Sequence, residues 1–317
     1  MAPRIAVVGA AGWAGSRHVK AFHELGAEVV ALVDPDPRAR RLAEAVGAEV
    51  LETPDQLAAA EVDLVVVALP SSVQPALVER LLRRGHRVLV EKPLGASSAD
   101  AASLGQVSGV HESLMVGYTL HHHPVARLLS AWVASSDVIS IGVRSAARKT
   151  AVDSWRAAPG ERGVVVVNGI HGIEYVASMF PGEATVQSTW TSRGLHGAAV
   201  PDYAAASVTF RDGPLFRLET YWNPWNHTEG LNGDDWDLEV DVVAREGRRL
   251  WSNWSLHAWD RSGSESVQHF PETDLFLAQA EAALRFADGG RPTVGYRQAL
   301  RATELADAVL AWDGARA

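Results

Sequence analysis

A glycine-rich turn between a short apolar run and a helical segment constrains the fold of this chain more than any other feature. The stretch "RIAVVGAAGWAG" has glycines at positions 9, 12 and 15, directly after a run typical of a buried strand. A sheet that binds a dinucleotide uses such glycines for the tight turn, for close approach of the backbone to the pyrophosphate and for helix–strand packing. Ala10 stands where the first glycine of the pattern usually falls. The turn predicts a dinucleotide site, although any tight strand-to-helix turn can use glycine.

The pattern of apolar runs divides the chain into two parts. Up to about residue 120, short runs rich in valine and leucine alternate with helical stretches, which predicts an α/β fold with a Rossmann dinucleotide-binding domain over residues 1–120. Later runs such as "DLEVDVVA" alternate apolar and acidic residues, so their strands have one buried and one polar face. We therefore expect residues 121–317 to form an α+β domain for substrate binding and oligomerisation, with an open-faced, largely antiparallel sheet. A helical tail is expected over about 274–312.

Composition and charge exclude several classes of partner. The 317 residues have a formal net charge of −9, and lysine and arginine form no stripe along the sequence. Both observations argue against nucleic acid or an anionic membrane as a partner. There is no cysteine, so disulfides, thiolate nucleophiles and cysteine-ligated zinc are excluded. No apolar stretch approaches the roughly 18 residues of a membrane span. We expect a soluble, cytoplasmic protein.

An acidic residue ends the second expected strand. In "ALVDPDP", Asp34 stands where the dinucleotide pattern has a carboxylate that accepts hydrogen bonds from a ribose 2′-hydroxyl. A carboxylate there repels a 2′-phosphate, so NAD is expected rather than NADP. The alternative is that Asp34 only caps the next helix. Arg38, Arg40 and Arg41 would suit a 2′-phosphate, but they are more typical of a solvated helix face.

A lysine follows another apolar run, in "HRVLVEKP". Ligands of an open α/β sheet bind at the carboxyl ends of its strands, so Lys92 is expected beside the ligand. A half-buried lysine there has a lowered pKa suited to general acid–base catalysis. Together, the glycine turn, Asp34 and Glu91-Lys92-Pro93 resemble the glucose–fructose oxidoreductase/inositol dehydrogenase (Gfo/Idh/MocA) family, whose members have such a lysine beside the nicotinamide.

The resemblance covers nearly the whole chain and implies an activity. It is carried further by "VDLVVVALPSSVQ", "EKPLGASSADAASL", "LMVGYTLHHHPVARLL" and "SWRAAPGERGVVVVNGIHGIE". It implies an NAD(P)-dependent oxidoreductase that acts on a sugar-like, cyclitol-like or related polyhydroxylated substrate, with Lys92 as general acid/base and His171 orienting the substrate. The residues expected to bind the cofactor are Gly9, Ala11, Gly12, Trp13, Ala14, Gly15, Asp34, Leu69, Pro70, Ser71, Glu91, Lys92 and Tyr118.

The expected substrate contacts come mostly from the second half of the chain: Lys92, His121, His123, Trp155, Arg156, Asn168, His171, Trp225 and His227. Three adjacent histidines, His121 to His123, are of a type that binds metal ions. Neighbouring residues on one segment do not easily converge on a single ion, however, so no metal is expected. Most of the eleven tryptophans are expected in the core or at an interface. The exposed face of the second sheet and the family resemblance imply a homodimer or homotetramer.

The stretch "GVVVVNGIHGIEY" departs from the family. Its four valines are typical of a buried strand, and its break at Asn168-Gly169 is expected to place His171 in the first turn of a helix, facing Lys92. The family signature Asp-x-x-x-His requires an aspartate where Val167 stands. On a strand, Asn168 could replace that carboxylate only if a bulge turned it to the same face. Val167 leaves two other readings open, which are a tightly NAD-bound enzyme that uses transient oxidation for elimination, epimerisation or glycoside cleavage, and a non-catalytic NAD-binding sensor.

Overall fold

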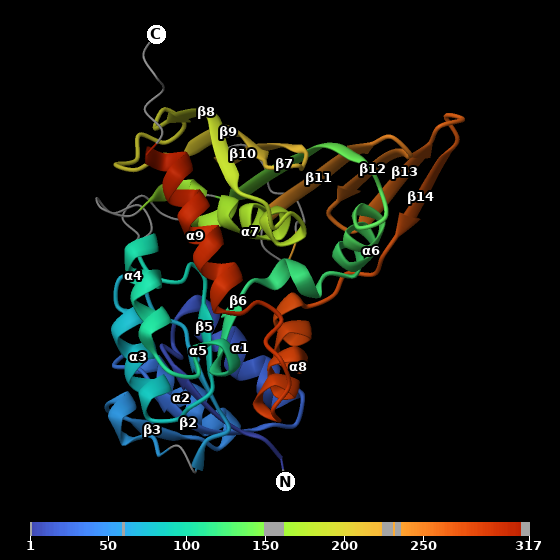
Figure 1. The fold of residues 1–317 in the computed structure, drawn as a ribbon. Helices are drawn as coiled ribbons and strands as arrows, with labels where there is room; N and C mark the ends of the chain where they lie inside the picture. The colour runs from blue at the N-terminus through green and yellow to red at the C-terminus, as the bar shows by residue number, and fades with distance from the viewer. Residues whose placement is uncertain (1, 59–60, 149–161, 224–230, 232–235, 312–317) are drawn as a thin grey trace. The chain divides into compact units, whose positions relative to one another are not determined.

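A computed structural model describes residues 2–58, 61–148, 162–223, 231 and 236–311. The chain divides into two compact units, which are described separately (Figure 1). Unit 1 consists of residues 1–119 and 274–300, and unit 2 consists of residues 120–273 and 301–317. The described helices include none that is long and apolar enough to cross a membrane.

Unit 1 contains a six-stranded sheet in the order β3-β2-β1-β4-β5-β6, and every pairing in it is parallel. Its strands are short and, apart from the exposed edge strand β3, mostly buried, as expected for a sheet covered on both faces. The Rossmann arrangement predicted from the alternating pattern is confirmed, and β3 is a strand that the pattern had not indicated. The strands are β1 (Arg4–Val8), β2 (Glu28–Val33), β3 (Glu49–Leu51), β4 (Leu64–Val67), β5 (Val88–Glu91) and β6 (Leu114–Gly117).

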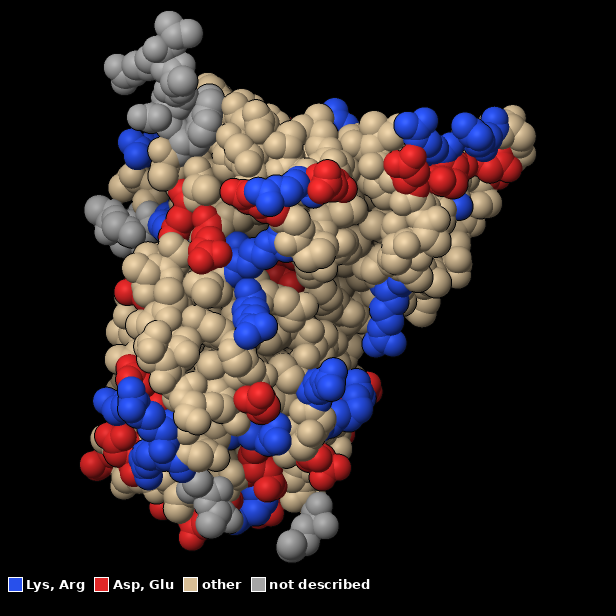
Figure 2. Space-filling view, viewed as in Figure 1, with Lys and Arg blue, Asp and Glu red and all other residues tan. Residues whose placement is uncertain are grey.

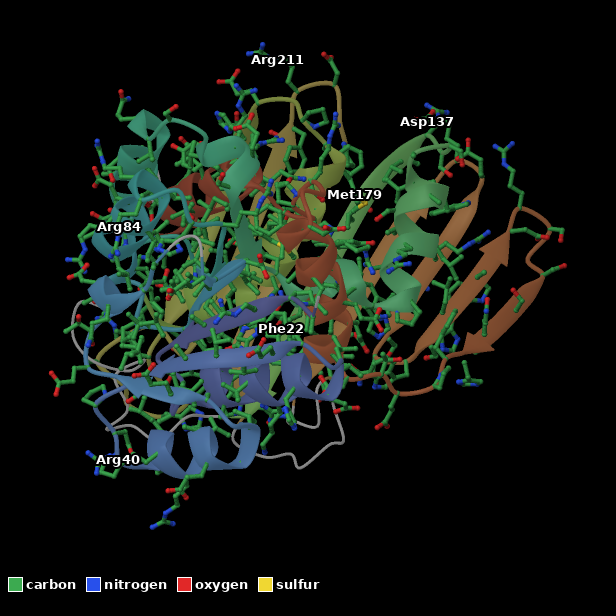
Figure 3. The ribbon with its side chains drawn as sticks, turned by 90° about the horizontal axis from the view of Figure 1, so that it is seen from below. Phe22, Arg40, Arg84, Asp137, Met179 and Arg211 are labelled. Carbon is green, nitrogen blue, oxygen red and sulfur yellow. The ribbon has the colours of Figure 1, made fainter. Side chains whose placement is uncertain are left out.

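The helices of unit 1 pack an apolar side on this sheet. Phe22 of α1 is fully buried there, whereas Arg40 and Arg84 extend outward (Figure 3). Acidic and basic side chains are interspersed on the face drawn in Figure 2, as the sequence indicated. The helices are α1 (Trp13–Glu24), α2 (Arg38–Val46), η1 (Pro54–Gln56), α3 (Gln74–Arg83), α4 (Ser98–Ser103), η3 (Leu104–Gln106), α5 (Val110–Ser113) and α8 (Leu275–Ala287).

Unit 2 contains an eight-stranded sheet in the order β14-β13-β12-β11-β7-β10-β9-β8. Only the β7–β10 pairing is parallel, so the prediction of a largely antiparallel sheet is confirmed. Buried and partly exposed residues alternate along β9 and β11, which gives one core face and one open face. The strands are β7 (Val138–Arg148), β8 (Ala184–Ser192), β9 (Tyr203–Phe210), β10 (Leu215–Asn223), β11 (Trp236–Ala244), β12 (Gly247–Ser252), β13 (Ser255–Asp260) and β14 (Glu265–His269).

The helices of unit 2 are η4 (Thr119–His122), α6 (Pro124–Val133), the π-helical turn η6 (Val165–Gly169), α7 (Ile170–Met179) and the later part of α9 (Tyr296–Ala311). Tyr175 of α7 donates a hydrogen bond to the carbonyl oxygen of Ala126 in α6 at 2.8 Å. Arg301 of α9 donates to the carbonyl oxygens of Ala177 and Phe180, at 2.9 and 2.6 Å. These bonds attach α6 to the middle of α7 and α9 to its C-terminal end.

The valine run is a helix, so its prediction as a strand was wrong. Gly163 and Val164 are already helical, and η6 leads without a break into α7. The first three valines are buried, as they would be in either kind of element, so their burial carries no information about the period. The helix lies against the core face of the sheet, where a Cβ at Gly169 would approach Thr220 Cγ2 of β10 to 2.9 Å. Tertiary packing therefore outweighs the β propensity of valine.

The division of the chain also differs from the predicted one after residue 273. The sequence places the whole helical tail in the second domain, whereas residues 274–300 cluster with unit 1. Phe276 of α8 packs on α1, with its ring centroid 5.4 Å from Trp13 and 5.1 Å from His18. The tail is two helices, because residues 288–295 interrupt it.

Candidate functional site

The glycine turn of unit 1 leaves no room for side chains. Gly9 has φ +81°, and a Cβ there would lie 2.3 Å from the carbonyl oxygen of Ala68. A Cβ at Gly15 would lie 2.0 Å from the carbonyl oxygen of Gly9. Gly12 precedes α1, and no side chain of the described residues caps this helix, so its first N–H groups are available to an anion. The turn therefore fits the pyrophosphate of a dinucleotide.

Asp34 follows β2 and bridges the glycine turn to its own loop. Its Oδ2 accepts a hydrogen bond from the N–H of Ala11, and its Oδ1 accepts one from the N–H of Asp36, both at 2.9 Å. Each carboxylate oxygen can accept a second bond, so Asp34 can still bind ribose hydroxyls. Arg38 pairs with Asp36 at 2.7 Å and lowers the pKa of that carboxyl group. Because Arg38 is already paired with Asp36, it is not positioned to bind the 2′-phosphate of NADP.

The loop after β4 contains three of the expected cofactor residues. Ser71 is buried, whereas Leu69 and Pro70 are partly exposed. Gln74 donates a hydrogen bond from Nε2 to the carbonyl oxygen of Leu69 at 2.8 Å, which closes the loop onto the start of α3. Tyr118, also expected at the cofactor, follows β6 and is 1% exposed. These residues lie beyond the carboxyl ends of parallel strands, where ligands of such sheets bind.

Glu91 and Lys92 lie at the carboxyl end of β5, and both are partly exposed. His18, which the sequence analysis did not single out, is fully buried on α1, and its Nε2 lies 2.8 Å from Glu91 Oε1. A Cβ at Gly117 would lie 3.1 Å from the same carboxylate oxygen, so glycine makes room for it. The carboxylate next to Lys92 is therefore fixed from α1.

His171 of unit 2 is 6% exposed, and its ring packs on that of Trp236 with centroids 4.8 Å apart. The indole of Trp236 is fixed in turn, because its Nε1 donates to Ser145 Oγ at 2.8 Å. His171 lies in the first turn of α7, as expected, but helical backbone already begins at Gly163, so this turn is not the N-terminus of a helix. The argument that a helix N-terminus keeps this ring neutral therefore does not apply.

Three polar side chains follow one another at three-residue spacing on this helix, at Asn168, His171 and Glu174. Residues three apart lie on one helix face, so these three residues form a polar stripe. Asn168 Oδ1 accepts a hydrogen bond from Trp222 Nε1 at 3.1 Å, and Glu174 is 1% exposed. The π-helical turn that contains Asn168 is a feature often found at functional sites. The polar stripe is the candidate substrate-binding part of unit 2.

His121 joins the polar stripe from η4. Its Nε2 lies 2.6 Å from Glu174 Oε2, and its ring centroid lies 5.8 Å from that of Tyr175. Burial lowers the pKa of His121, but the charge of Glu174 and its hydrogen bond outweigh burial and raise this pKa above the usual value. Burial also raises the pKa of the Tyr175 hydroxyl.

The contacts of His123 are those of a structural residue that packs in the core and caps a helix. It is fully buried between Trp251 and Trp254, with ring centroids at 4.7 and 4.4 Å. Its Nδ1 accepts a hydrogen bond from the N–H of Val125 and so caps α6. Burial lowers the pKa of His123 to about 4. Among the described residues, no group of three or more histidines and carboxylates could hold a metal ion.

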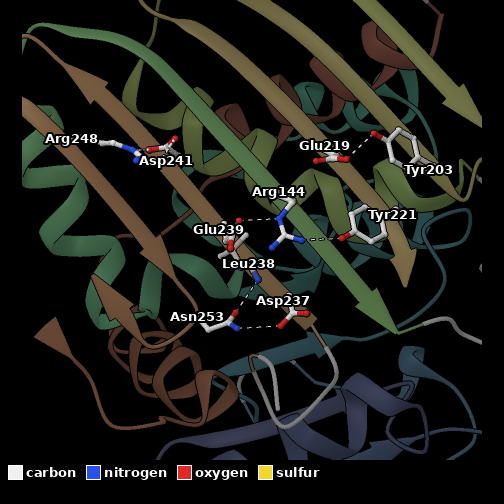
Figure 4. A network of polar contacts seen from close by, with 10 residues as sticks. All are labelled: Arg144, Tyr203, Glu219, Tyr221, Asp237, Leu238, Glu239, Asp241, Arg248 and Asn253. Atoms are coloured by element: carbon white, nitrogen blue, oxygen red, sulfur yellow. Dashed lines mark hydrogen bonds and ion pairs between the residues drawn. The ribbon is translucent and has the colours of Figure 1, made fainter. Parts of the chain in front are cut away.

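The open face of the unit 2 sheet carries a row of cross-strand contacts (Figure 4). Arg144 of β7 donates to Glu239 Oε2 of β11 and to the hydroxyl of Tyr221 in β10, both at 2.9 Å. Tyr203 donates to Glu219 Oε1 at 2.8 Å, and its pKa is raised to about 12, by burial and by this carboxylate. A hollow in this face is lined by Gly142, Val143, Arg144, Arg217, Leu218, Glu219, Glu239 and Asp241.

Trp155, Arg156, Trp225 and His227 lie outside the described residues. The residues that the sequence analysis missed are His18, Glu174, Trp222 and Trp236. For Glu174 there was a signal, because Asn168, His171 and Glu174 share a three-residue spacing that a helical reading of the valine run would have revealed. The other three are distant in sequence from their partners, and no local pattern indicates such pairs.

Comparisons with known proteins agree with this architecture. A model described as an oxidoreductase family with an NAD-binding Rossmann fold matches residues 3–118. Inositol 2-dehydrogenase of Rhizobium meliloti is 35% identical over 127 residues. The matched stretch covers 39% of this chain and 38% of that protein, well under half of either. The rhizopine catabolism protein MocA of Rhizobium meliloti is 27% identical over 249 residues, which are 73% of this chain and 76% of that protein.

The fold extends to solved structures with little sequence identity. The crystal structure of an oxidoreductase from Agrobacterium radiobacter in complex with NAD+, L-tartaric acid and magnesium aligns with a TM-score of 0.84 at 16% identity. The alignment covers 98% of this chain and 97% of that one. Residues 3–118 therefore match the oxidoreductase family with an NAD-binding Rossmann fold, and the whole chain has the fold of the aligned Agrobacterium radiobacter structure.

Proposed function

We propose that this protein is an NAD(P)-dependent oxidoreductase that interconverts an alcohol and a ketone on a sugar-like, cyclitol-like or related polyhydroxylated substrate. The observation that carries the proposal is the position of Lys92 at the carboxyl end of β5, in the same unit as an uncapped α1 N-terminus behind a glycine turn. The names of the relatives support the substrate class, since one is an inositol 2-dehydrogenase and the other a rhizopine catabolism protein.

The dinucleotide is held by residues of unit 1. The glycine turn and α1 bind the pyrophosphate through backbone N–H groups, and Asp34 accepts hydrogen bonds from the adenosine ribose. The carboxylate disfavours a 2′-phosphate, so NAD is the preferred cofactor and NADP the weaker one. Leu69, Pro70, Ser71, Glu91 and Tyr118 complete the proposed contacts; Gly9, Ala11, Gly12, Trp13, Ala14 and Gly15 form the turn.

Lys92 is the general acid/base of this proposal. NAD bound in unit 1 supplies the hydride acceptor for oxidation of the substrate carbon. Lys92 takes the proton from the substrate hydroxyl in that direction, and it returns a proton to the carbonyl oxygen in the reverse direction. His171 orients the hydroxyl, with its own ring held by Trp236. Asn168 and His121 provide further substrate hydrogen bonds, and Trp155, Arg156, Trp225 and His227 remain predicted contacts.

A second candidate function follows from one residue. Val167 stands where the family signature has an aspartate, and valine can neither accept a proton nor orient a hydroxyl. This favours an enzyme that keeps its NAD bound and oxidises its substrate only transiently, for elimination, epimerisation or glycoside cleavage, or a sensor that binds NAD without turnover. Nucleotide that survives dialysis of the purified protein would support the tightly bound form.

The open face of the unit 2 sheet suits self-association as a homodimer or homotetramer. Trp190 is 61% exposed on this sheet, and its ring lies 5.2 Å from that of Tyr203. Tyr203 stacks on Tyr221 at 6.0 Å, and Tyr221 accepts a hydrogen bond from Arg144. Exposed aromatic and arginine side chains are enriched at protein interfaces, which supports this assembly.

The decisive experiment measures NADH formation with a panel of polyols, cyclitols and sugar derivatives, for the wild-type protein and for Lys92→Ala. We expect steady turnover on at least one compound, reduced by at least about 100-fold in the variant, as expected for loss of a general acid/base. Unchanged turnover in Lys92→Ala would exclude the assigned role. Full NAD affinity without turnover on any compound would support the sensor.

A further inference from the structure

Glu174 contributes a carboxylate to the polar stripe, and it is more deeply buried than His171. The residue is 1% exposed, and Oε1 has no hydrogen-bond partner among the described residues. Oε2 is bonded to His121 Nε2 at 2.6 Å. An isolated carboxylate in such a place is strongly disfavoured unless a positive charge faces it. Among the described residues, the group that faces it is the ring of His121.

The ring of His121 has two different sides. Nε2 faces Glu174, whereas Nδ1 makes no hydrogen bond to a described residue and is not closed off from solvent. The His121 side chain is 19% exposed, against 1% for that of Glu174. A histidinium bound to a carboxylate through one nitrogen presents its other N–H as a donor. The pair therefore presents a single hydrogen-bond donor to the outside, fixed in direction by the buried carboxylate.

Its location relates this donor to the proposed substrate residues. Glu174 lies three residues after His171 on α7, and residues at this spacing lie on one helix face. The donor side of His121 is thus attached to the same face as the ring proposed to orient the substrate hydroxyl. Histidine alone would titrate near neutrality, so a reliable donor needs a partner that keeps it protonated.

We propose that Glu174 is a positioning residue for substrate recognition, which holds His121 so that its Nδ1–H donates a hydrogen bond to a hydroxyl or carbonyl oxygen of the substrate near His171. The proposal rests on the proposed oxidoreductase function. It makes His121 a specificity residue that recognises an oxygen next to the reacting carbon, separate from the proton transfer assigned to Lys92.

The protonation of His121 gives the proposal a pH signature. Glu174 raises the pKa of His121, so the donor is present at neutral pH and is lost as the pH rises through that raised value. Substrate affinity should fall in the same range, because the neutral ring keeps its N–H on Glu174 and turns a lone pair outward. The other titratable and charged groups on the elements that pack here are His171 and Tyr175 of α7, His122 of η4, His123, the cap of α6, and Arg127 within α6.

The test compares Glu174→Gln, His121→Arg and the exposed control Glu272→Gln in the full chain. For Glu174→Gln we expect KM for the substrate to rise by about 10- to 100-fold at neutral pH with kcat within about threefold, as for loss of one hydrogen bond to a charged group. The alkaline limb of kcat/KM should move to lower pH. His121→Arg should keep KM within about fivefold and lose that limb, because arginine stays protonated. Glu272→Gln should behave as wild type.

A second readout does not depend on activity. NMR of protein labelled at histidine carbons, with the His121 signal assigned from its absence in His121→Arg, should show a titration midpoint above that of free histidine, which falls in Glu174→Gln. An unchanged midpoint, or an unchanged KM with an unchanged alkaline limb, would overturn the proposal. If Glu174→Gln does not fold, His121→Arg alone tests the proposal: its kcat/KM profile should lose the alkaline limb, and a retained limb would overturn the proposal. If Lys92→Ala keeps full turnover, the proposed function fails instead, whatever the outcome at Glu174.

Discussion

The indole of Trp222 on β10 donates a hydrogen bond from Nε1 to Oδ1 of Asn168 at 3.1 Å. Trp222 is 1% exposed, so the bond fixes the amide of Asn168 from the core of the sheet. With its oxygen bound to Trp222, Asn168 keeps its amide N–H groups as donors. Asn168 therefore differs from its neighbour Val167, whose side chain has no hydrogen-bonding group.

Asn168→Ala should lower kcat/KM by about 10- to 100-fold, because it removes a polar group of the stripe and leaves the buried Trp222 N–H without its acceptor. Val167→Ala should stay within about threefold of wild type. Steady-state kinetics with the best substrate of the panel checks both. Equal losses in the two variants would show that the site does not distinguish these positions, and that Asn168 does not stand in for the family aspartate.

Asp34→Ser should reduce the preference for NAD over NADP by at least about tenfold, since it removes the carboxylate that repels a 2′-phosphate. Calorimetric Kd values for the two dinucleotides measure this preference. Glu44→Ser, at an exposed position on α2, is the matched control and should leave the ratio unchanged. A ratio that is unaffected in Asp34→Ser would show that Asp34 serves only its hydrogen bonds to Ala11 and Asp36.

His18→Leu should weaken NAD binding by about tenfold, because Glu91 loses the hydrogen bond that holds it at 2.8 Å. We also expect the free energy of unfolding to fall by about 1–3 kcal/mol, because the carboxylate of Glu91, whose side chain is only 12% exposed, loses its hydrogen-bond partner. His23→Leu changes an exposed histidine of the same helix and is the control for both quantities. Wild-type affinity in His18→Leu, measured by calorimetry, would exclude a role for the His18–Glu91 bond in the cofactor site.

Acid should destabilise the protein through His123. Its pKa is lowered to about 4 by burial, whereas the unfolded chain has an ordinary value near 6.5. The unfolded state therefore binds more protons between these values, and stability falls as the pH drops through this window, by at most about 3 kcal/mol. Denaturant unfolding at pH 7 and pH 5 measures the effect. His123→Asn keeps a capping acceptor for α6 but cannot titrate, so its pH dependence should be smaller; an equal dependence would exclude His123 as the cause.

Trp190→Asp should convert the proposed oligomer to monomer, because it places a charge on the open face of the sheet, where Trp190 is 61% exposed. Sedimentation velocity at several concentrations measures the state. Leu128→Asp alters an exposed apolar residue of α6, a helix that packs on the sheet next to β12, and should leave the assembly intact. An assembly that resists Trp190→Asp would locate the interface elsewhere.

Much of the fold was predictable from local pattern. The buried runs of unit 1, the glycine turn before α1 and the alternation in β11 each depend on neighbours within a few residues, and the structure confirms the elements they predicted. The valine run shows the limit of this approach. Four β-branched apolar residues satisfy a buried strand and a buried helix equally well, and the chain decides between them by packing Gly169 against Thr220.

Three features were predictable from the sequence: the two-part architecture, the glycine turn with Asp34, and the place of Lys92 after a strand. Each depends on spacing along the chain, which sets turns, periodicity and the edge of a parallel sheet. Three-dimensional packing was needed to see that Asn168, His171 and Glu174 form one helix face, and that Trp222, Trp236 and His121 hold them. These partners come from strands and turns distant in sequence. Their pairing depends on burial and hydrogen bonding across elements, which no local pattern encodes.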